Sequence, residues 1–384
     1  MKKNNILIFQ RILPSYRIPV FKYLAKKIGI YICYSKHKSG SSLKSEDIDD
    51  DIHFIKIPCI YIGKTETSVM QNPIHAIHNY KPSIIISEGA ITYLTLWILI
   101  FLRFFFSYKL IIWSHGIRFN EMDIPFNNMR SKIQLWIFNK ADAIILYSDG
   151  RAKIVKDHIK LPEKVFVARN TLNTEYLKSI YYNLNSKGRE KIRYELGFSK
   201  TFNLIFIGRL LSGKGLMDLV KAFRILSKEL DLALHIIGDG PEKSKLKDEV
   251  TGLSNIFFHG AVFDQVHAGK LLFSSDLMVM PGYVGLSVVH AFAFGCPVIT
   301  YLDVEKRIPI HSPEVEYIKD QENGLFCLPN PEKLAESIYK LFKNPTKLKL
   351  FSMNALKTAY NDASILKMEE GFRGAISYVK SHFY

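Results

Sequence analysis

The stretch NLIFIGRLLSGKG, residues 203–215, decides the fold. Asn203–Ile207 is mostly apolar and predicts a buried strand. The glycine-rich loop Gly208–Gly215 follows at once, and the pattern after it predicts a helix over Leu216–Leu230. Strand, loop and helix in this order form half of a unit in which parallel strands alternate with helices. The sequence therefore predicts an α/β fold.

The same loop carries the residue types of an anion site. Its glycines allow the backbone to approach a ligand closely, and the N-terminus of the next helix favours negative charge. Arg209 can hold a phosphate through two N–H groups, and Lys214 supplies a point charge. The spacing is not that of a P-loop. These features indicate diphosphate binding; an exposed loop with two cations is the alternative.

Strand and helix patterns alternate in both halves of the chain. In the second half, the strand Ala233–Ile237 ends in the turn Gly238–Pro241. Two doubly wound domains with a cleft between them follow, with ligands at the carboxyl ends of the strands. We expect an N-terminal domain over residues 1–175, a connection over 176–200, a second domain over 201–362, and a C-terminal helix over 363–384 that packs back toward the first domain.

The composition excludes disordered and collagen-like chains, since 48% of the 384 residues are hydrophobic and 23% are charged. The formal charge is +16, and residues 1–170 carry 25 Lys or Arg against 13 Asp or Glu. Nucleic acid, an anionic membrane or an anionic ligand would each explain this excess, and a solvated surface is the alternative. Motifs typical of nucleic-acid binding are missing, which argues against that partner.

Metal and disulfide chemistry have little support in the sequence. The four cysteines are far apart and form no CxxC pair, which is typical of reduced thiols in a cytosolic protein. His75 and His78 stand three residues apart, and we expect a solvated helical face there rather than a metal site. The opening residues do not resemble a signal peptide, so we expect a cytoplasmic protein.

The apolar segment Ile91–Phe106 is shorter than the roughly 20 residues that span a bilayer, and Arg103 interrupts it. It lies between two strand patterns, which favours a buried crossover helix. Its aromatic residues also permit one face to contact lipid. Together with the positive charge nearby, this predicts peripheral attachment to the inner face of the cytoplasmic membrane.

Seven segments together resemble the retaining GT-B glycosyltransferases of glycosyltransferase family 4. The resemblance implies a GT-B fold of two Rossmann-like domains facing a central cleft, a nucleotide-diphosphate sugar as donor, and no metal requirement. We expect uridine rather than guanosine in the donor. The segments are GRLLSGKG (208–215), IIGDGPE (236–242), MPGYVGLSVVHAFAFGCPVIT (280–300), SPEVEYIKDQENGLF (312–326), WSHG (113–116), VARNTLNT (167–174) and the opening LPSYRIPVF (13–21).

The chain departs from the family where two glutamates usually stand seven residues apart. Gly282 and His290 occupy those positions. In the family the first acid lies near the donor sugar and the second near the ribose. His290 can still bond a ribose hydroxyl, whereas contact at Gly282 must come from the backbone, through Tyr283 or Val284. Glu314, in the segment that matches the family's PE motif, is a nearby acid that can compensate.

The resemblance assigns residues to three roles. It implies that Arg209 and Lys214 stabilise the leaving diphosphate and that His115 contacts the donor sugar or the leaving phosphate. Tyr16 and Arg17 are expected to bind an acceptor pyrophosphate. The residues expected at the donor nucleotide or sugar are Gly208, Gly215, Gly238, Gly240, Gly282, Tyr283, Val284, Gly285, Leu286, His290 and Glu314.

The sequence thus predicts a glycosyltransferase of surface-polysaccharide synthesis, such as capsule or O-antigen synthesis. Its expected partners are a nucleotide sugar, a lipid-linked or oligosaccharide acceptor and an anionic membrane surface. Two alternatives stay open. One is another GT-B enzyme, such as a nucleotide-sugar epimerase, and the other is a non-catalytic basic protein that binds membrane or nucleic acid.

Overall fold

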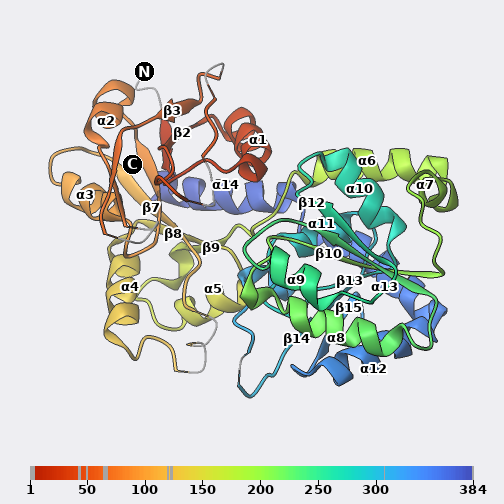
Figure 1. Ribbon diagram of the computed structural model, residues 1–384. Coiled ribbons are helices and arrows are strands. Elements are labelled where there is room, and N and C mark those ends of the chain that lie inside the picture. The colour runs from red at the N-terminus through yellow and green to blue at the C-terminus, as the bar shows by residue number, and fades with distance from the viewer. Residues whose placement is uncertain are drawn as a thin grey trace. The chain divides into compact units, whose positions relative to one another are not determined.

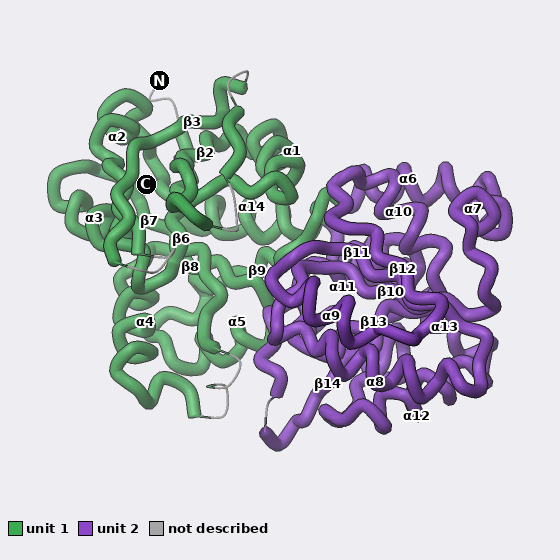
Figure 2. The backbone as a smooth tube through the Cα atoms, in the orientation of Figure 1, with its two compact units in different colours: residues 1–173, 365–384 green, residues 174–364 purple. Residues whose placement is uncertain are grey.

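The computed structural model describes residues 5–41, 45–48, 51–63, 68–118, 121, 124–306 and 308–382. The chain forms two compact units (Figure 2). Unit 1 comprises residues 1–173 and 365–384, and unit 2 comprises residues 174–364. Each unit is built on one parallel sheet with helices packed against it (Figure 1).

The sheet of unit 1 has the strand order β3-β2-β1-β6-β7-β8-β9, with every neighbouring pair parallel. A short antiparallel hairpin, β4–β5, accompanies it. The strands are β1 Ile6–Phe9, β2 Ile30–Tyr34, β3 Phe54–Lys56, β4 Cys59–Tyr61, β5 Val69–Gln71, β6 Ile84–Glu88, β7 Lys109–Ser114, β8 Ala143–Leu146 and β9 Val165–Val167. The helices are η1 Ser15–Arg17, α1 Ile18–Ile28, α2 Ile74–Tyr80, α3 Leu94–Leu102, α4 Met129–Lys140, α5 Asp149–Lys156, η3 Pro162–Lys164 and α14 Ile365–Ser381.

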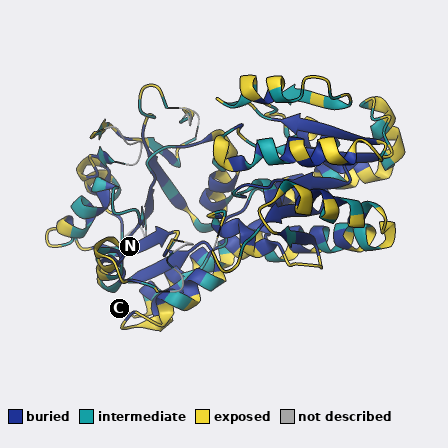
Figure 3. Ribbon diagram, turned by 60° about the horizontal axis from the view of Figure 1, so that its bottom comes forward, coloured by how far each residue is buried: buried dark blue, intermediate teal, exposed yellow. Residues whose placement is uncertain are grey.

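Strand β1 shows why this sheet carries helices on both faces. Successive side chains of a strand point to opposite faces, so an apolar run supplies both. Ile6 and Ile8 belong to one buried cluster, together with Phe372 of α14. Leu7 and Phe9 belong to the other buried cluster. Figure 3 shows the central strands of both sheets as mostly buried and the outward faces of the helices as exposed.

Unit 2 repeats the plan with the strand order β12-β11-β10-β13-β14-β15, again all parallel. Its strands are β10 Phe202–Ile207, β11 Leu232–Ile237, β12 Ile256–Gly260, β13 Leu277–Val279, β14 Val298–Tyr301 and β15 Gly324–Cys327. The helical segments are α6 Thr174–Lys187, α7 Arg189–Glu195, η4 Ser212–Lys214, α8 Leu216–Leu226, α9 Lys243–Glu249, α10 Gln265–Ser274, α11 Ser287–Ala293, η5 Pro313–Tyr317, α12 Pro331–Phe342, α13 Pro345–Lys357 and η6 Thr358–Asp362.

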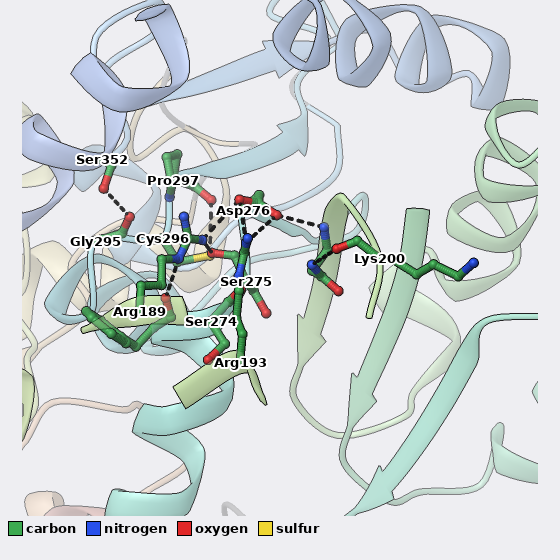
Figure 4. Close-up of polar contacts among 12 residues, drawn as sticks. Arg189, Arg193, Lys200, Ser274, Ser275, Asp276, Gly295, Cys296, Pro297 and Ser352 are labelled. Carbon is green, nitrogen blue, oxygen red and sulfur yellow. Dashed lines mark hydrogen bonds and ion pairs between the residues drawn. The ribbon is translucent and has the colours of Figure 1, made fainter. Parts of the chain in front are cut away.

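The segment expected as a connection over 176–200 is instead mostly helical and belongs to unit 2. Leu177 and Leu184 of α6 and Ile192 of α7 are buried. Arg193 of α7 holds Asp276 through two contacts of 2.8 Å, just before β13 begins (Figure 4). Many polar residues separate these buried positions, so the apolar periodicity was not recognised in the sequence. The helix content of this segment was therefore underestimated.

The apolar segment 91–106 forms the helix α3 over Leu94–Leu102 only, which is shorter than expected. Leu96 and Leu99 are buried, as a crossover helix requires, while Phe104 and Phe105 follow the helix and are 83% and 69% exposed. Within the described ranges, no helix combines the length and apolar character needed to cross a membrane. The C-terminal helix α14 belongs to unit 1.

Candidate functional site

The order of the strands in unit 2 reverses beside β10. From β10 the chain proceeds outward through β11 and β12, and it then returns to the other side of β10 with β13. In open parallel sheets, ligands bind outside the carboxyl ends of the strands at such a switch point. The loop 208–215 follows β10, and the segment 280–286 follows β13. These two segments therefore form the candidate site of unit 2.

Glycines allow the loop 208–215 after β10 and the turn 238–241 after β11 to pack with their backbones in direct contact. A Cβ atom on Gly238 would lie 1.9 Å from the carbonyl oxygen of Gly208, and one on Gly240 would lie 2.4 Å from that of Leu210. The amide of Leu210 donates to the carbonyl of Asp239 at 3.0 Å. Both glycines also have φ angles that L side chains rarely adopt, +145° and +159°. The turn after β11 thus supports the loop after β10.

The segment after β13 is bonded to the same loop. The amide of Gly282 donates to the carbonyl of Lys214 at 3.0 Å, and the amide of Tyr283 donates to that of Gly213 at 3.1 Å. A Cβ atom on Gly282 would lie 2.0 Å from the carbonyl oxygen of Gly213. Any side chain at position 282 would therefore displace the backbone of the loop. This close packing is the physical reason why a glutamate cannot stand there.

Lys214 lies at the centre of these contacts and is only 8% exposed. Its ammonium group donates to the carbonyl of Tyr283 at 2.8 Å and lies 3.8 Å from the centroid of the Tyr283 ring. Burial lowers the pKa of Lys214 to about 8; the charge of Glu314 opposes this shift and that of Arg209 adds to it. Arg209 itself is exposed. The loop thus combines one buried and one exposed cation.

Three further polar side chains are buried around this segment. His311 accepts a hydrogen bond from the amide of Val284 at 3.2 Å, and its other ring nitrogen lies 2.8 Å from the carbonyl of Tyr301. Burial lowers the pKa of His311 to about 4, so the ring is neutral at pH 7 and donates to Tyr301. Glu314 is 4% exposed. His290 is 8% exposed, and its Nε2 has no hydrogen-bond partner in the described part of the chain.

Unit 1 has its own switch point, between β1 and β6, and a cationic and aromatic cluster lies on this sheet. The guanidinium of Arg17 lies 5.3 Å from the Trp113 ring centroid and 5.7 Å from that of Tyr147. The His115 ring lies 4.5 Å from the Tyr147 ring. Arg151 donates to the carbonyl of His115 at 3.2 Å. Desolvation, together with the charges of Arg151 and Arg17, lowers the pKa of His115 to about 3, although the side chain is partly open to solvent.

Comparison with known proteins assigns the second unit. Residues 201–344 match the family described as Glycosyl transferases group 1. This segment is therefore similar to a glycosyl transferases group 1 domain. It comprises the sheet of unit 2 and all the loops described above for that unit. The match covers less than half of the chain, and unit 1 lies outside it.

Two curated relatives align with parts of this chain. An uncharacterized glycosyltransferase of Methanocaldococcus jannaschii is 28% identical over 265 residues, which cover 64% of this chain and 62% of that protein. The poly(glycerol-phosphate) alpha-glucosyltransferase of Bacillus subtilis is 32% identical over 167 residues, covering 42% of this chain and 24% of that enzyme. The chain thus spans less than two thirds of the length of either relative.

A solved structure extends the likeness to the whole chain. The protein HepE of Anabaena, solved in complex with UDP, superposes with a TM-score of 0.69 at 16% identity, covering 98% of this chain and all of that one. At this identity the likeness concerns the fold alone. The fold is GT-B, with two Rossmann-like parallel sheets, and the sequence-based prediction of the fold class is confirmed.

The structure brings most of the predicted donor residues of the group 1 domain together. Gly208, Gly215, Gly238 and Gly240 line the two adjacent turns after β10 and β11, while Gly282 and Val284 contact Lys214 and His311. Gly285 has no atom within 4 Å of a Cβ built on it, and Leu286 caps α11. Tyr16 and Arg17 both lie in η1 of unit 1.

Sequence reasoning missed the aromatic partners of both key cations. Tyr283 was expected to act through its backbone, but its ring also contacts Lys214. The rings of Trp113 and Tyr147 around Arg17 were not considered, because Trp113 stands on β7 and Tyr147 directly follows β8. In both places the contact joins segments far apart in the sequence, which no local pattern reveals.

Among the described residues, no group of three or more His, Cys, Asp or Glu side chains is arranged to hold a metal ion.

Proposed function

We propose that this protein is a retaining glycosyltransferase of family 4, which transfers a sugar from a nucleotide-diphosphate sugar to a lipid-linked saccharide acceptor in surface-polysaccharide synthesis. The observation that carries the proposal is the buried ammonium of Lys214 between the loops after β10 and β13. Arg209 stands in the same loop, so a diphosphate at this edge would meet two cations.

The chemistry of the transfer needs these cations. The bond between the anomeric carbon and the phosphate oxygen breaks, and a bond from an acceptor hydroxyl oxygen to that carbon forms. Negative charge grows on the leaving diphosphate, which takes up the acceptor proton. Fixed positive groups stabilise that charge, and removing one such group costs roughly 10²- to 10³-fold in rate. Arg209 and Lys214 have this role in the proposal, and His115 contacts the sugar or the leaving phosphate.

Donor recognition in the proposal uses the remaining residues of the group 1 domain. His290 offers its ring nitrogen to a ribose hydroxyl, because Nε2 is buried and has no partner in the described residues. Glu314 supplies the buried carboxylate that the glycine at position 282 cannot provide. We propose UDP as the nucleotide; HepE, which shares the fold, was solved with UDP.

The acceptor is proposed to bind unit 1, with its diphosphate at Tyr16 and Arg17. Aromatic side chains hold Arg17, and Tyr147 accepts a hydrogen bond from it at 3.4 Å. Phe101, Phe104 and Phe105 are exposed on and after α3, and the Phe101 ring lies 5.4 Å from that of Phe105. This aromatic surface, in a unit rich in Lys and Arg, supports peripheral contact with an anionic membrane.

A thermal-shift panel of nucleotide diphosphates and nucleotide sugars tests the donor site. We expect one nucleotide family to raise the melting temperature, because a ligand at 100 times its Kd stabilises the folded state by about 2.7 kcal/mol. The double variant Arg209→Ala with Lys214→Ala should lose this shift. The exposed pair Arg224→Ala with Lys228→Ala serves as the matched control and should keep it.

A wild-type protein that no nucleotide stabilises would instead favour the non-catalytic alternative. Acceptor binding is tested separately by sedimentation with anionic and zwitterionic vesicles and by product formation on lipid-linked saccharides. A protein that neither binds anionic vesicles nor modifies any such acceptor would contradict the acceptor proposal while leaving the donor proposal standing.

A further inference from the structure

The ammonium group of Lys214 is held by three contacts with neutral groups. It donates to the carbonyl of Tyr283 at 2.8 Å, lies 3.8 Å from the Tyr283 ring centroid, and approaches the sulfur of Met280 at 3.9 Å. A cation within about 6 Å of a ring centroid is attracted by the negative face of the ring. One residue, Tyr283, therefore contacts the ammonium with both its backbone and its side chain.

The backbone fixes where this ring lies. The amides of Gly282 and Tyr283 are bonded to the carbonyls of Lys214 and Gly213, so the two segments cannot slide past each other. A Cβ atom on Gly213 would lie 2.9 Å from the Tyr283 ring. The ring thus covers the loop at Gly213, which has no side chain, and Lys214 follows immediately.

An aromatic ring beside an ammonium group is neutral, whereas a carboxylate in the same place carries a negative charge that competes with an anionic ligand. The ring attracts the ammonium without adding a second negative charge to that of Glu314, which already acts on Lys214. The packing at Gly282 excludes a carboxylate from the adjacent position. The direct contacts of the ammonium described above are therefore all with neutral groups, namely the carbonyl and ring of Tyr283 and the sulfur of Met280.

We propose that the Tyr283 side chain is a positioning residue for Lys214, holding its ammonium beside the loop 208–215 where a nucleotide diphosphate binds. The proposal rests on the proposed donor site and adds a side-chain role to a residue expected to act through its backbone. Tyr283 acts through Lys214, so its effect on binding must disappear when Lys214 is absent.

Calorimetric titration of UDP into the full-length protein tests this dependence. Tyr283→Leu removes the ring, and we expect UDP to bind about three- to tenfold more weakly, which is within the range of one cation–π contact. Tyr283→Phe keeps the ring and should restore most of the affinity. In a Lys214→Ala background, Tyr283→Leu should weaken binding no further. The matched control is Tyr194→Leu, at a tyrosine that is 88% exposed on α7.

A second measurement needs no nucleotide. Brief acetylation with acetic anhydride, read by mass spectrometry, should label Lys214 several-fold more in Tyr283→Leu than in wild type and Tyr283→Phe, relative to the exposed Lys228. Equal labelling of Lys214 in all three proteins would overturn the proposal. So would equal losses of UDP affinity in Tyr283→Phe and Tyr283→Leu, or an undiminished effect of Tyr283→Leu without Lys214. If wild type binds no nucleotide diphosphate, the proposed function fails, and the labelling still decides whether Tyr283 holds Lys214.

Discussion

Gly282 shows how a single hydrogen atom in place of a side chain shapes the candidate site. Its Cβ would lie 2.0 Å from the carbonyl oxygen of Gly213 and 2.4 Å from two backbone atoms of Lys214. Gly282→Ala should therefore separate the two loops, at a cost of about 1–3 kcal/mol typical of overpacking. We expect scanning calorimetry to show a lower melting temperature for unit 2, together with weaker UDP binding.

The matched control is Gly285→Ala, three residues further on. Nothing lies within 4 Å of a Cβ at that position, and no unusual φ is recorded there. This variant should stay within about 0.5 kcal/mol of wild type in stability. Equal melting temperatures for the two variants would show that position 282 tolerates a side chain and would undermine our explanation for the missing glutamate.

The buried ring of His290 lowers the stability of the folded protein, because one of its nitrogens lacks a hydrogen-bond partner in the described residues. Its Nε2 is buried without a hydrogen-bond partner in the described chain, and burial lowers the pKa of the ring to about 4. An unsatisfied buried polar group costs about 1–3 kcal/mol. His290→Leu should therefore raise the melting temperature of unit 2 by a few degrees while weakening UDP binding about tenfold, the value of one good hydrogen bond.

Calorimetry on the same preparations separates the two effects. The exposed His267 on α10 offers the control His267→Leu, which should change neither the melting temperature nor the affinity. Tighter or unchanged UDP binding in His290→Leu would contradict the role of His290 at the ligand.

At this scale the sequence predicted the cations but not what holds them. Arg209 and Lys214 are recognisable because their loop is a continuous segment between a strand and a helix. The ring of Tyr283 and the buried ring of His311 contact that site from segments about 70 and 100 residues further along the chain. Their roles depend on strand order, which the local pattern does not contain.

Helix α7 illustrates the next scale, where polar side chains attach an element to the sheet. Asp276 is 9% exposed and accepts hydrogen bonds from Arg189 and Arg193 as well as from the amide of Asn203, at 2.7–3.1 Å (Figure 4). Removing one partner of a buried ion pair costs about 3–5 kcal/mol, because the remaining charges lose their compensation. Asp276→Asn should therefore lower the melting temperature of unit 2 by roughly 6–12 °C.

The exposed ion pair of the same unit gives the comparison. Arg224 and Glu249 lie 3.1 Å apart with side chains 44% and 34% exposed. Because such surface pairs contribute about 0–1 kcal/mol, Glu249→Gln should leave the melting temperature nearly unchanged. If both substitutions have the same small effect in calorimetry, α7 is held by its apolar side chains alone.

Elements were predicted best where apolar residues are continuous. Strands β1, β10 and β11 are buried on both faces, so their apolar runs identify them directly. Helices α6 and α7 were underestimated because arginines, rather than a wide apolar stripe, attach α7 to the sheet. Helix α3 was overestimated, since Phe104 and Phe105 extend the apolar run beyond the helix but are exposed.

The whole chain was predicted as two doubly wound units because the alternation of strands and helices occurs twice, and this order permits few topologies. The return of the chain to unit 1 through α14 follows from its burial of Phe372 and Met368 there. The position of the switch point in each sheet depends on which strands pair, and this pairing cannot be read from the sequence. That pairing places the loops of the candidate donor site side by side.

The buried histidines of unit 2 make the free energy of unfolding depend on pH. Burial lowers the pKa of His235 to about 3 and those of His290 and His311 to about 4. In the unfolded chain these rings titrate near 6.5. Between about pH 6.5 and 4 the unfolded state binds protons that the folded state does not, so the free energy of unfolding falls as the pH falls. Each ring contributes a slope of up to about 1.4 kcal/mol per pH unit in this range.

Calorimetry between pH 5 and 7.5 should accordingly show the unit 2 transition moving to lower temperature below pH 6.5. His290→Leu removes one of the three rings, so its melting temperature should depend less steeply on pH than that of wild type. His267→Leu removes an exposed ring and should leave the dependence unchanged. A wild-type transition that does not move between pH 7 and 5 would mean that the buried rings take up protons without unfolding. In that case a protonated His311 could no longer accept the hydrogen bond from the amide of Val284, and the segment after β13 would have to be supported by its other contacts.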